Sequence, residues 1–383
     1  MTGRPGRRHA WGLVSTKHTG TTALLSVLLA VTAVGCGDDW AAGEPPPPIG
    51  ACGGSLGTGG AETGGAGTGG TSGSGGAPAN FFTVVALPDT QYYAALYPYV
   101  FESQVKWILD QREARRIAFV LHEGDIVNGD VSPEWEVASR AMHKLDGVVP
   151  YVLAMGNHDY LSSGIDDRSG TMINQYFPLA PLAASPGFRG SFAPDHIENT
   201  AQFLMMGDVP WLVISLEFGP RDAVLAWADG VVKQYPDMPA LIVTHAYQSW
   251  DGTRYDHVAK PTFAEQPYNP WQYSASPPPG GVNDGEEMWR KLIRDNESIR
   301  LVINGHTFNP STGDAAATLT SSHPSGALVH QIVANYQETA LGGGGYLRVM
   351  QFCPDQHELR VSTYSPYLDS WKQDPANAFT LPL

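Results

Sequence analysis

The sequence predicts a layered α/β fold for residues 81–383, and three observations support this. Short apolar runs that are typical of strands occur throughout this region. They alternate with stretches in which apolar residues recur every three or four positions, as in amphipathic helices. Several of the runs are followed directly by polar residues of the kinds that bind metals. Alternating strands and helices favour sheets covered by helices, which is an α/β architecture.

The strand-like runs and helical patterns can be placed along the chain. We expect strands at residues 81–87, 117–121, 148–155, 211–216, 241–243 and 301–303. Phe101, Val105, Ile108 and Leu109 form one helical stripe, and Ser132 followed by Pro133 predicts the N-cap and first turn of another helix. Apolar spacing predicts two further helices, around residues 224–227 and 288–293.

The last part of the chain predicts a hairpin. The glycine run at residues 342–345 precedes a strand and is therefore interpreted as a turn. Two strands at residues 346–352 and 358–364 are joined through residues 353–356. Residues 160–207 show weak periodicity, which is consistent with an insertion or lid or with inert packing.

The first 35 residues predict a signal peptide. They carry four basic residues and no acidic one, and the apolar run at residues 23–34 is too short to span a bilayer comfortably. The segment Ala33-Val34-Gly35-Cys36 resembles a bacterial lipobox, which predicts that Cys36 is acylated and becomes the mature N-terminus. Ala33 stands where such boxes usually have leucine. Secretion after ordinary cleavage and a short membrane anchor therefore remain alternatives.

Residues 36–80 predict a flexible linker, since a short proline run is followed by repeated glycine, threonine and serine. A coil of this composition reaches about 35–40 Å. Such a linker would hold the domain at residues 81–383 clear of a membrane. We therefore expect an exported protein that is either a membrane-anchored lipoprotein or periplasmic or extracellular.

The charge of the chain argues against a nucleic-acid partner. Removal of the signal peptide leaves 19 basic residues against 38 acidic ones, a net charge of −19. Binding to nucleic acids depends on neutralising phosphates with basic side chains. Three cysteines do not predict a disulfide framework. Cys52 and Cys353 could pair in an oxidising compartment or remain as free thiols.

Polar residues follow the predicted strands at their carboxyl ends. In layered α/β proteins the loops at this edge of the sheet converge, and ligands bind there. A single such residue is usually a turn former, but here they recur on successive strands. They are Asp89 and Gln91, Asp125, then Asn157, His158 and Asp159, and later His245 and His306.

These motifs resemble those of the calcineurin-like metallophosphoesterases. That family has Asp-x-His, Gly-Asp, Gly-Asn-His-Asp/Glu, a separate His and a closing Gly-His-x-His. This sequence has Asp89-Thr90-Gln91, Gly124-Asp125, Gly156-Asn157-His158-Asp159, Thr244-His245 and Gly305-His306. The resemblance implies a four-layer αββα sandwich with two mixed sheets.

The resemblance also implies a pair of divalent metal ions. One ion would be bound by Asp89, Gln91 and Asp125, and the other by Asp125, Asn157, His245 and His306. Oxygen and imidazole ligands suit manganese, iron or zinc. Such a pair would bind the phosphate of a small-molecule ester and activate the attacking water, so that phosphomonoesters or phosphodiesters are hydrolysed.

The family pattern assigns the remaining roles. His158 would protonate the leaving oxygen, and Asp159 would orient its ring and keep it charged. Near the motifs, Asn128, Tyr247 and Arg254 are candidates for contacts with the substrate or with the ligands.

This sequence departs from the family pattern at two positions, and both would supply ligands to the same metal ion. Gln91 stands where the family often has histidine, and Phe308 replaces the second histidine of the closing motif. An amide oxygen is a weaker donor than imidazole for borderline metals. We therefore expect one tight and one weak site, the weak one favouring manganese or magnesium and taking an additional ligand such as Asn309 or water.

Two other functions fit the sequence less well than hydrolysis by this family. A non-catalytic, surface-displayed domain that binds metal or phosphate would retain the fold, but His158 and Asn157 are both present. A purple acid phosphatase requires a tyrosine ligand three residues after the aspartate of Gly-Asp, where this chain has Asn128.

Overall fold

The computed structural model describes residues 80–161, 168, 170–274 and 277–383, which all belong to one compact unit spanning residues 47–383. The signal peptide, lipobox and linker predicted from the sequence lie outside the described residues. Within them, no helix is both long and apolar enough to cross a membrane.

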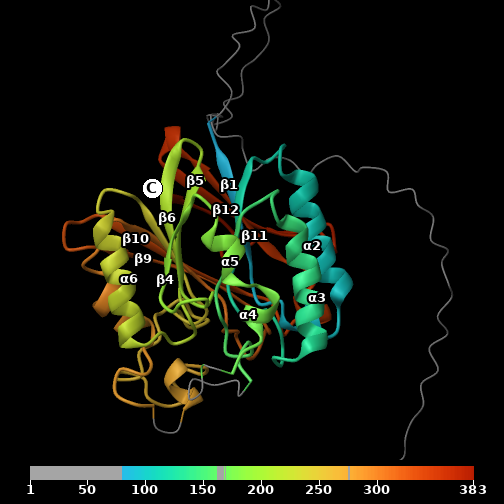
Figure 1. Ribbon diagram of the computed structural model, residues 1–383. Coiled ribbons are helices and arrows are strands. Elements are labelled where there is room, and N and C mark those ends of the chain that lie inside the picture. Colours follow the sequence, from blue (N-terminus) through green and yellow to red (C-terminus); the bar gives the residue numbers. More distant parts are fainter. Residues whose placement is uncertain (1–79, 162–167, 169, 275–276) are drawn as a thin grey trace, which may run out of the picture. The chain divides into compact units, whose positions relative to one another are not determined.

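Two mixed sheets form the centre of the fold (Figure 1). The first has the order β13-β12-β11-β1-β2-β3, with β14 also paired to β12. Its strands are β1 (Phe82–Leu87), β2 (Ile117–His122), β3 (Tyr151–Leu153), β11 (Leu347–Cys353), β12 (Glu358–Ser365), β13 (Ser370–Lys372) and β14 (Ala378–Pro382).

The second sheet has the order β4-β5-β6-β7-β8-β10-β9. Its strands are β4 (Phe188–Ser191), β5 (Thr200–Met206), β6 (Val209–Ser215), β7 (Ala240–Val243), β8 (Ile299–Asn304), β9 (Ala315–Ser322) and β10 (Leu328–Asn335). Parallel pairing joins β1, β2 and β3 in the first sheet and β6, β7, β8 and β10 in the second.

The helices cover the outer faces of both sheets. The α-helices are α1 (Gln91–Ala95), α2 (Pro98–Gln111), α3 (Ser132–Met142), α4 (Ile173–Tyr176), α5 (Leu179–Ala183), α6 (Asp222–Gln234), α7 (Gly285–Met288) and α8 (Ala340–Gly343). Short helical segments of other types are η1 (His143–Leu145), η2 (Pro270–Tyr273), η3 (Trp289–Ile293) and η4 (Pro354–Gln356). In Figure 1, α2 and α3 lie on one side and α6 on the other.

Period-two alternation along the strands builds three apolar layers. Val84 and Ala86 of β1 face the second sheet, where they pack in one cluster with Leu241 and Leu301. The intervening residues of β1 face α2 and α3 instead. A third cluster joins the second sheet to α6 and η3. The order helix, sheet, sheet, helix confirms the predicted four-layer sandwich.

Most predicted elements are present with small shifts in their ends. The strand expected at residues 148–155 is shorter, Tyr151–Leu153, because the backbone N–H groups of Val148 and Val149 bond to Leu145 in a turn. Ser132 is not an N-cap: α3 begins at Ser132, and Val131 precedes it. The hairpin between β11 and β12 is confirmed.

The stretch at residues 160–207, which had little periodicity, contributes α4, α5, β4 and β5. These strands extend the second sheet beyond β6. Cys353 is buried and disulfide-bonded, and Cys52, the partner considered in the sequence analysis, lies outside the described residues.

Candidate metal centre

The predicted site residues meet where strands of both sheets end. Asp89, Gln91, Asp125 and Asn157 follow β1, β2 and β3 of the first sheet, whereas His245 and His306 follow β7 and β8 of the second. All six side chains are buried. The space between the two sheets at this edge is therefore lined by donors from both.

Two glycines allow the loops to approach this closely. A Cβ atom on Gly156 would lie 2.0 Å from Oδ1 of Asp125, and one on Gly305 would lie 2.2 Å from Oδ1 of Asp89. Any side chain at either position would displace a carboxylate of the site. The Gly-Asn-His-Asp and Gly-His motifs thus need glycine for space.

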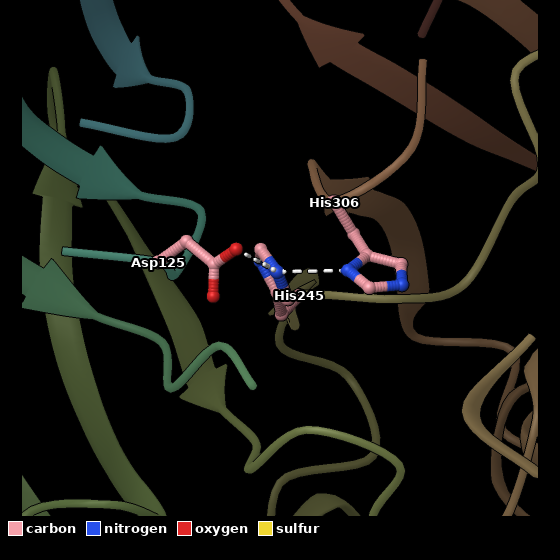
Figure 2. A group of neighbouring side chains, drawn as sticks. All are labelled: Asp125, His245 and His306. Atoms are coloured by element: carbon pink, nitrogen blue, oxygen red, sulfur yellow. Dashed lines mark hydrogen bonds and ion pairs between the residues drawn. The ribbon is translucent and has the colours of Figure 1, made fainter. Parts of the chain in front are cut away.

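The two imidazoles face each other across the site (Figure 2). Nδ1 of His245 donates to the carbonyl of Glu123 at 2.8 Å, and Nε2 of His306 donates to the carbonyl of Tyr268 at 2.8 Å. The remaining nitrogens, Nε2 of His245 and Nδ1 of His306, are 3.1 Å apart. Oδ2 of Asp125 lies 3.2 Å from Nε2 of His245.

This arrangement favours a positive charge between the rings. A carbonyl can only accept, so the outer nitrogen of each ring carries hydrogen and the facing nitrogens of neutral rings both present lone pairs. Two lone pairs at 3.1 Å repel unless a proton or a cation lies between them. Asp125, His245 and His306 offer three donor atoms that lie within 4.8 Å of one another, which is suited to an ion.

Shifts in pKa show the same preference. Burial would lower the pKa of His245, but the carboxylates of Asp125 and Asp89 outweigh burial and raise it to about 9. Burial and the charge of His245 lower the pKa of His306 to about 3. Burial would raise the pKa of Asp125, yet the charges of His245 and His158 hold it below its usual range. The pocket therefore stabilises positive charge at its centre.

Two buried amide oxygens complete the ligand set. Oε1 of Gln91 and Oδ1 of Asn157 have no hydrogen-bond partner among the described residues. Buried polar atoms are almost always paired in native proteins. Both belong to residues that the sequence assigns to metals, and a cation would satisfy them. The residues present thus fit a metal centre.

Asp89 has a partner that the sequence analysis missed. Its Oδ1 accepts the N–H of His306 at 3.1 Å, and its Oδ2 accepts from Nδ2 of Asn335 at 2.8 Å. Burial raises the pKa of Asp89 to about 7, against the opposing charge of His245. Asn335 ends β10, so the rule that polar residues follow strands could have found it had that strand been predicted.

His158 is fixed differently from our prediction. Its backbone N–H donates to Oδ1 of Asp125 at 2.9 Å, and Nδ1 of its ring bonds to the carbonyl of Asn128 at 2.7 Å. The oxygens of Asp159 instead accept the backbone N–H groups of Val127 and Gly156 at 3.0 and 2.8 Å. The carbonyl of Asn128, rather than Asp159, therefore orients the ring.

Asp159 has a structural role in this arrangement. It joins the loop after β3 to the loop after β2. Burial, together with the charge of Asp125, raises its pKa well above the usual range. The predicted bond between Asp159 and the His158 ring is therefore absent, because the Asp159 oxygens bond to the backbone instead.

Three further candidates have other partners. The hydroxyl of Tyr247 and the guanidinium of Arg254 both bond to Gln331 on β10, and Arg254 also pairs with Glu286. Oδ1 of Asn309 accepts from the backbone and hydroxyl of Ser311 and so caps its own turn. Their suggested roles near the substrate or the weak ion are not supported, since these side chains stabilise the surrounding loops.

Phe308, which replaces the second histidine of the closing motif, lies against the loop that contains Tyr268. The ring of Phe308 packs on Tyr268, with centroids 4.9 Å apart. Tyr268 has a left-handed backbone, with φ of 68°, and its carbonyl bonds to His306. Phe308 thus supports the loop that orients His306. The sequence alone gave no signal for Tyr268, which lies in a long connection after β7.

A second group of metal-binding residue types is explained by hydrogen bonds. The side chain of Asp284 accepts the backbone N–H of Glu287, and the side chain of Glu287 accepts the backbone N–H of Asp284. The pair forms a capping box at the start of α7. His257 donates its backbone N–H to Asp284 and stacks on Trp271. This group has the partners expected of a helix N-terminus.

The comparison with protein families identifies the relationship. A sequence model described as calcineurin-like phosphoesterase matches residues 82–310. The chain belongs to this family. The matched part of the phosphoesterase contains every residue of the candidate metal centre that the sequence predicted, whereas β9 to β14 follow it.

One curated relative is a Bacillus subtilis (strain 168) protein called "Uncharacterized protein YvnB". It is 29% identical over 291 residues, which make up 76% of the phosphoesterase chain. These residues amount to 20% of the relative, so this chain spans about a fifth of the length of the curated protein it matches.

Several solved structures are similar to the phosphoesterase at low identity. They include a 5'-nucleotidase precursor from Thermus thermophilus (13% identity, TM-score 0.41, 79% of this chain and 55% of that one). GAP50, described as the anchor in the inner membrane complex of Plasmodium, has 10% identity and a TM-score of 0.44, over 79% of this chain and 88% of that one. The NAD nucleotidase NadN of Haemophilus influenzae has 12% identity and a TM-score of 0.39, over 77% of this chain and 54% of that one. Similarity at this level carries no argument about substrates or partners.

Proposed function

We propose that the protein hydrolyses phosphate esters with the help of two divalent metal ions. The observation that supports this most directly is the pair of facing imidazoles beside Asp125, together with the unpartnered amide oxygens of Gln91 and Asn157. These atoms would hold ions at the edge where both sheets end. Manganese, iron and zinc suit the donors.

When bound, the ions would neutralise phosphate oxygens and lower the pKa of water. The side chains of the protein would position the ions and supply the proton for the leaving oxygen. Backbone bonds to Glu123 and Tyr268 fix the ring nitrogens of His245 and His306 that point into the site. The bond from Asn335 fixes the carboxylate of Asp89.

His158 is the proposed general acid. Nδ1 of its ring is used by the carbonyl of Asn128, which leaves Nε2 to carry a proton to the leaving oxygen. Its backbone N–H bonds to Asp125, so the ring is held beside the residue that both ions would share. The ring is half-buried, as required for contact with a substrate.

The proposal is tested by assaying purified protein against nitrophenyl esters, nucleotides and cyclic nucleotides, with several metals and after chelation. Activity should require metal. His158→Gln should lower turnover about a hundredfold or more without changing metal content, whereas His196→Gln, at an exposed histidine, should not. Full turnover in chelated protein would overturn the mechanism. Metal binding without turnover of any ester would favour a binding domain.

We also propose that the protein is exported and tethered through an acylated Cys36, with residues 36–80 as a flexible spacer. The sequence of residues 1–80 supports this. Cys36→Ala should shift the protein out of the membrane fraction or block its processing, because the acyl chains that bind the membrane would be lost. An unchanged distribution on immunoblots of fractionated cells would contradict the anchor.

A further inference from the structure

A cavity of about 580 Å³ lies along one side of the sandwich, away from the metal centre. Its lining comes from β3, the outermost strand of the first sheet, from β5 of the second sheet, and from α5 with nearby loops. None of the described residues assigned to the metal centre lines it. Its walls are mainly apolar and include Val149, Leu153, Phe177, Leu182, Ile197 and Leu204.

One polar side chain in this cavity lacks a partner. Gln202 of β5 lines the cavity and is only 3% exposed, and its Nε2 has no hydrogen-bond partner among the described residues. It lies on the same face of β5 as Leu204, which packs between the sheets. A buried carboxamide offers N–H donors and an acceptor oxygen, and both kinds of group are normally used.

Four other polar side chains of the cavity already have partners. His143 bonds to Asp146 and to the carbonyl of Tyr176, and the hydroxyl of Tyr151 donates to Asp146. Thr200 bonds to Ser215. Neither lysine nor arginine occurs among the described residues that line the cavity. The one carboxylate among these described residues, Asp146, is already bonded to His143 and Tyr151, so a charged ligand would lose its hydration without gaining an unpaired opposite charge.

We propose that this cavity binds an uncharged small molecule with an aliphatic body and one amide or ester group. The volume is within the range of about 300–1,000 Å³ that small-molecule sites occupy, and such sites combine apolar walls with a few placed polar groups. The aliphatic part packs between β3 and α5, and the polar group bonds to the carboxamide of Gln202. The inference is independent of the proposed hydrolysis.

The test is calorimetric titration of the full chain with octanamide, using octanoate and octylammonium as charged analogues of equal length. Octanamide should bind saturably and more tightly than either ion. Gln202→Leu should weaken it roughly threefold to tenfold, the effect of one neutral hydrogen bond. Leu182→Trp, which puts a larger side chain into the lining of the cavity, should abolish binding.

Gln351→Leu is the matched control, because Gln351 is also a strand glutamine with an unpartnered buried oxygen but does not line the cavity. This variant should bind octanamide like the wild type. The proposal is overturned if octanamide does not bind saturably, if the charged analogues bind equally well, or if Gln202→Leu retains full affinity. Equal weakening by both glutamine variants would also overturn it.

Discussion

Backbone strain occurs at three residues that orient the polar side chains of the candidate site. Asp125 and His306 have φ values of 47° and 75°, and Tyr268, whose carbonyl fixes His306, has 68°. Residues other than glycine rarely adopt this left-handed region, and it costs on the order of 1–3 kcal/mol each. Here the side chains of Asp125 and His306 both point to Nε2 of His245. The surrounding hydrogen bonds maintain the strain, which preorganises the ligands.

The exchange of histidine for phenylalanine at position 308 predicts unequal metal sites. Under the proposed assignment, Asp125, Asn157, His245 and His306 would form a complete set for one ion, whereas Asp89 and Gln91 would share Asp125 with the second ion. Titration of manganese into chelated protein should therefore show two steps of different affinity, with activity following the second. Two equally tight ions that resist dialysis would contradict this.

Restoring the missing imidazole provides the converse experiment. Phe308→His should strengthen the weaker manganese site, because imidazole is a better donor to borderline metals than an amide oxygen. The variant is best compared with Phe308→Leu, which removes the ring contact with Tyr268 without adding a donor. If both variants change the second step equally, loss of packing rather than ligation is responsible.

At the scale of elements, the sequence predicted which candidate residues lie together because they follow strands with clear apolar runs. The carboxyl ends of β1, β2, β7 and β8 bring the ligands together through parallel pairing. What it missed depends on contacts between distant elements. Asn335 ends β10, whose mixed sequence Leu-Val-His-Gln-Ile-Val-Ala-Asn obscured the strand.

The role of Asp159 was mistaken for the same reason. Adjacency in sequence suggested a bond to His158, but the fold brings the N–H of Val127 closer. Periodicity also failed in β4 and β5, which lie at one side of the second sheet, and residues of β5 line the cavity. Residues there face a partly open space, so the selection for alternating apolar side chains is weaker.

A buried ion cluster connects the loop after β3 to the loop before α6. Glu217 is 1% exposed and lies 2.7 Å from Arg221 and 3.6 Å from Arg168. Arg168 also donates to the carbonyls of Phe218 and Gly219. Phe218 in turn packs on both metal-centre histidines. The cluster therefore supports the floor of the site.

Glu217→Gln should destabilise the fold by about 3–5 kcal/mol at neutral pH, because it leaves buried arginine charge uncompensated. Burial would raise the pKa of Glu217, but Arg168 and Arg221 lower it. When the pKa of a carboxyl is lower in the folded than in the unfolded protein, its charge stabilises the fold above the unfolded pKa, about 4.3 for glutamate. This stabilisation is lost as the pH falls through the folded pKa. The difference in unfolding free energy between the wild type and Glu217→Gln should therefore become smaller below about pH 4.3.

Urea unfolding followed by circular dichroism between pH 7 and pH 3 measures this difference. Asp110→Asn serves as the control, since it removes an exposed pair with Lys106 and should cost less than about 1 kcal/mol. A difference between wild type and Glu217→Gln that stays constant through this range would show that the charge of Glu217 does not contribute.

For the whole domain, the candidate metal centre joins the two sheets. The first sheet supplies Asp89, Gln91, Asp125 and Asn157, and the second supplies His245 and His306, so bound ions would link both halves of the sandwich. A ligand that binds only the folded state stabilises it by about 2.7 kcal/mol at a hundred times its Kd. For a domain of this size, that corresponds to a rise in Tm of about 4 °C.

We therefore expect manganese to raise the Tm of chelated protein, in two stages if the sites differ in affinity. His245→Ala should abolish most of the rise, since it removes a donor of the second sheet, whereas His158→Gln should retain it because that ring is proposed to bind the substrate rather than an ion. Scanning calorimetry over a manganese series measures both. A Tm that is indifferent to chelation would contradict a metal link between the sheets, because ions bound by both sheets must favour the folded state over the unfolded chain.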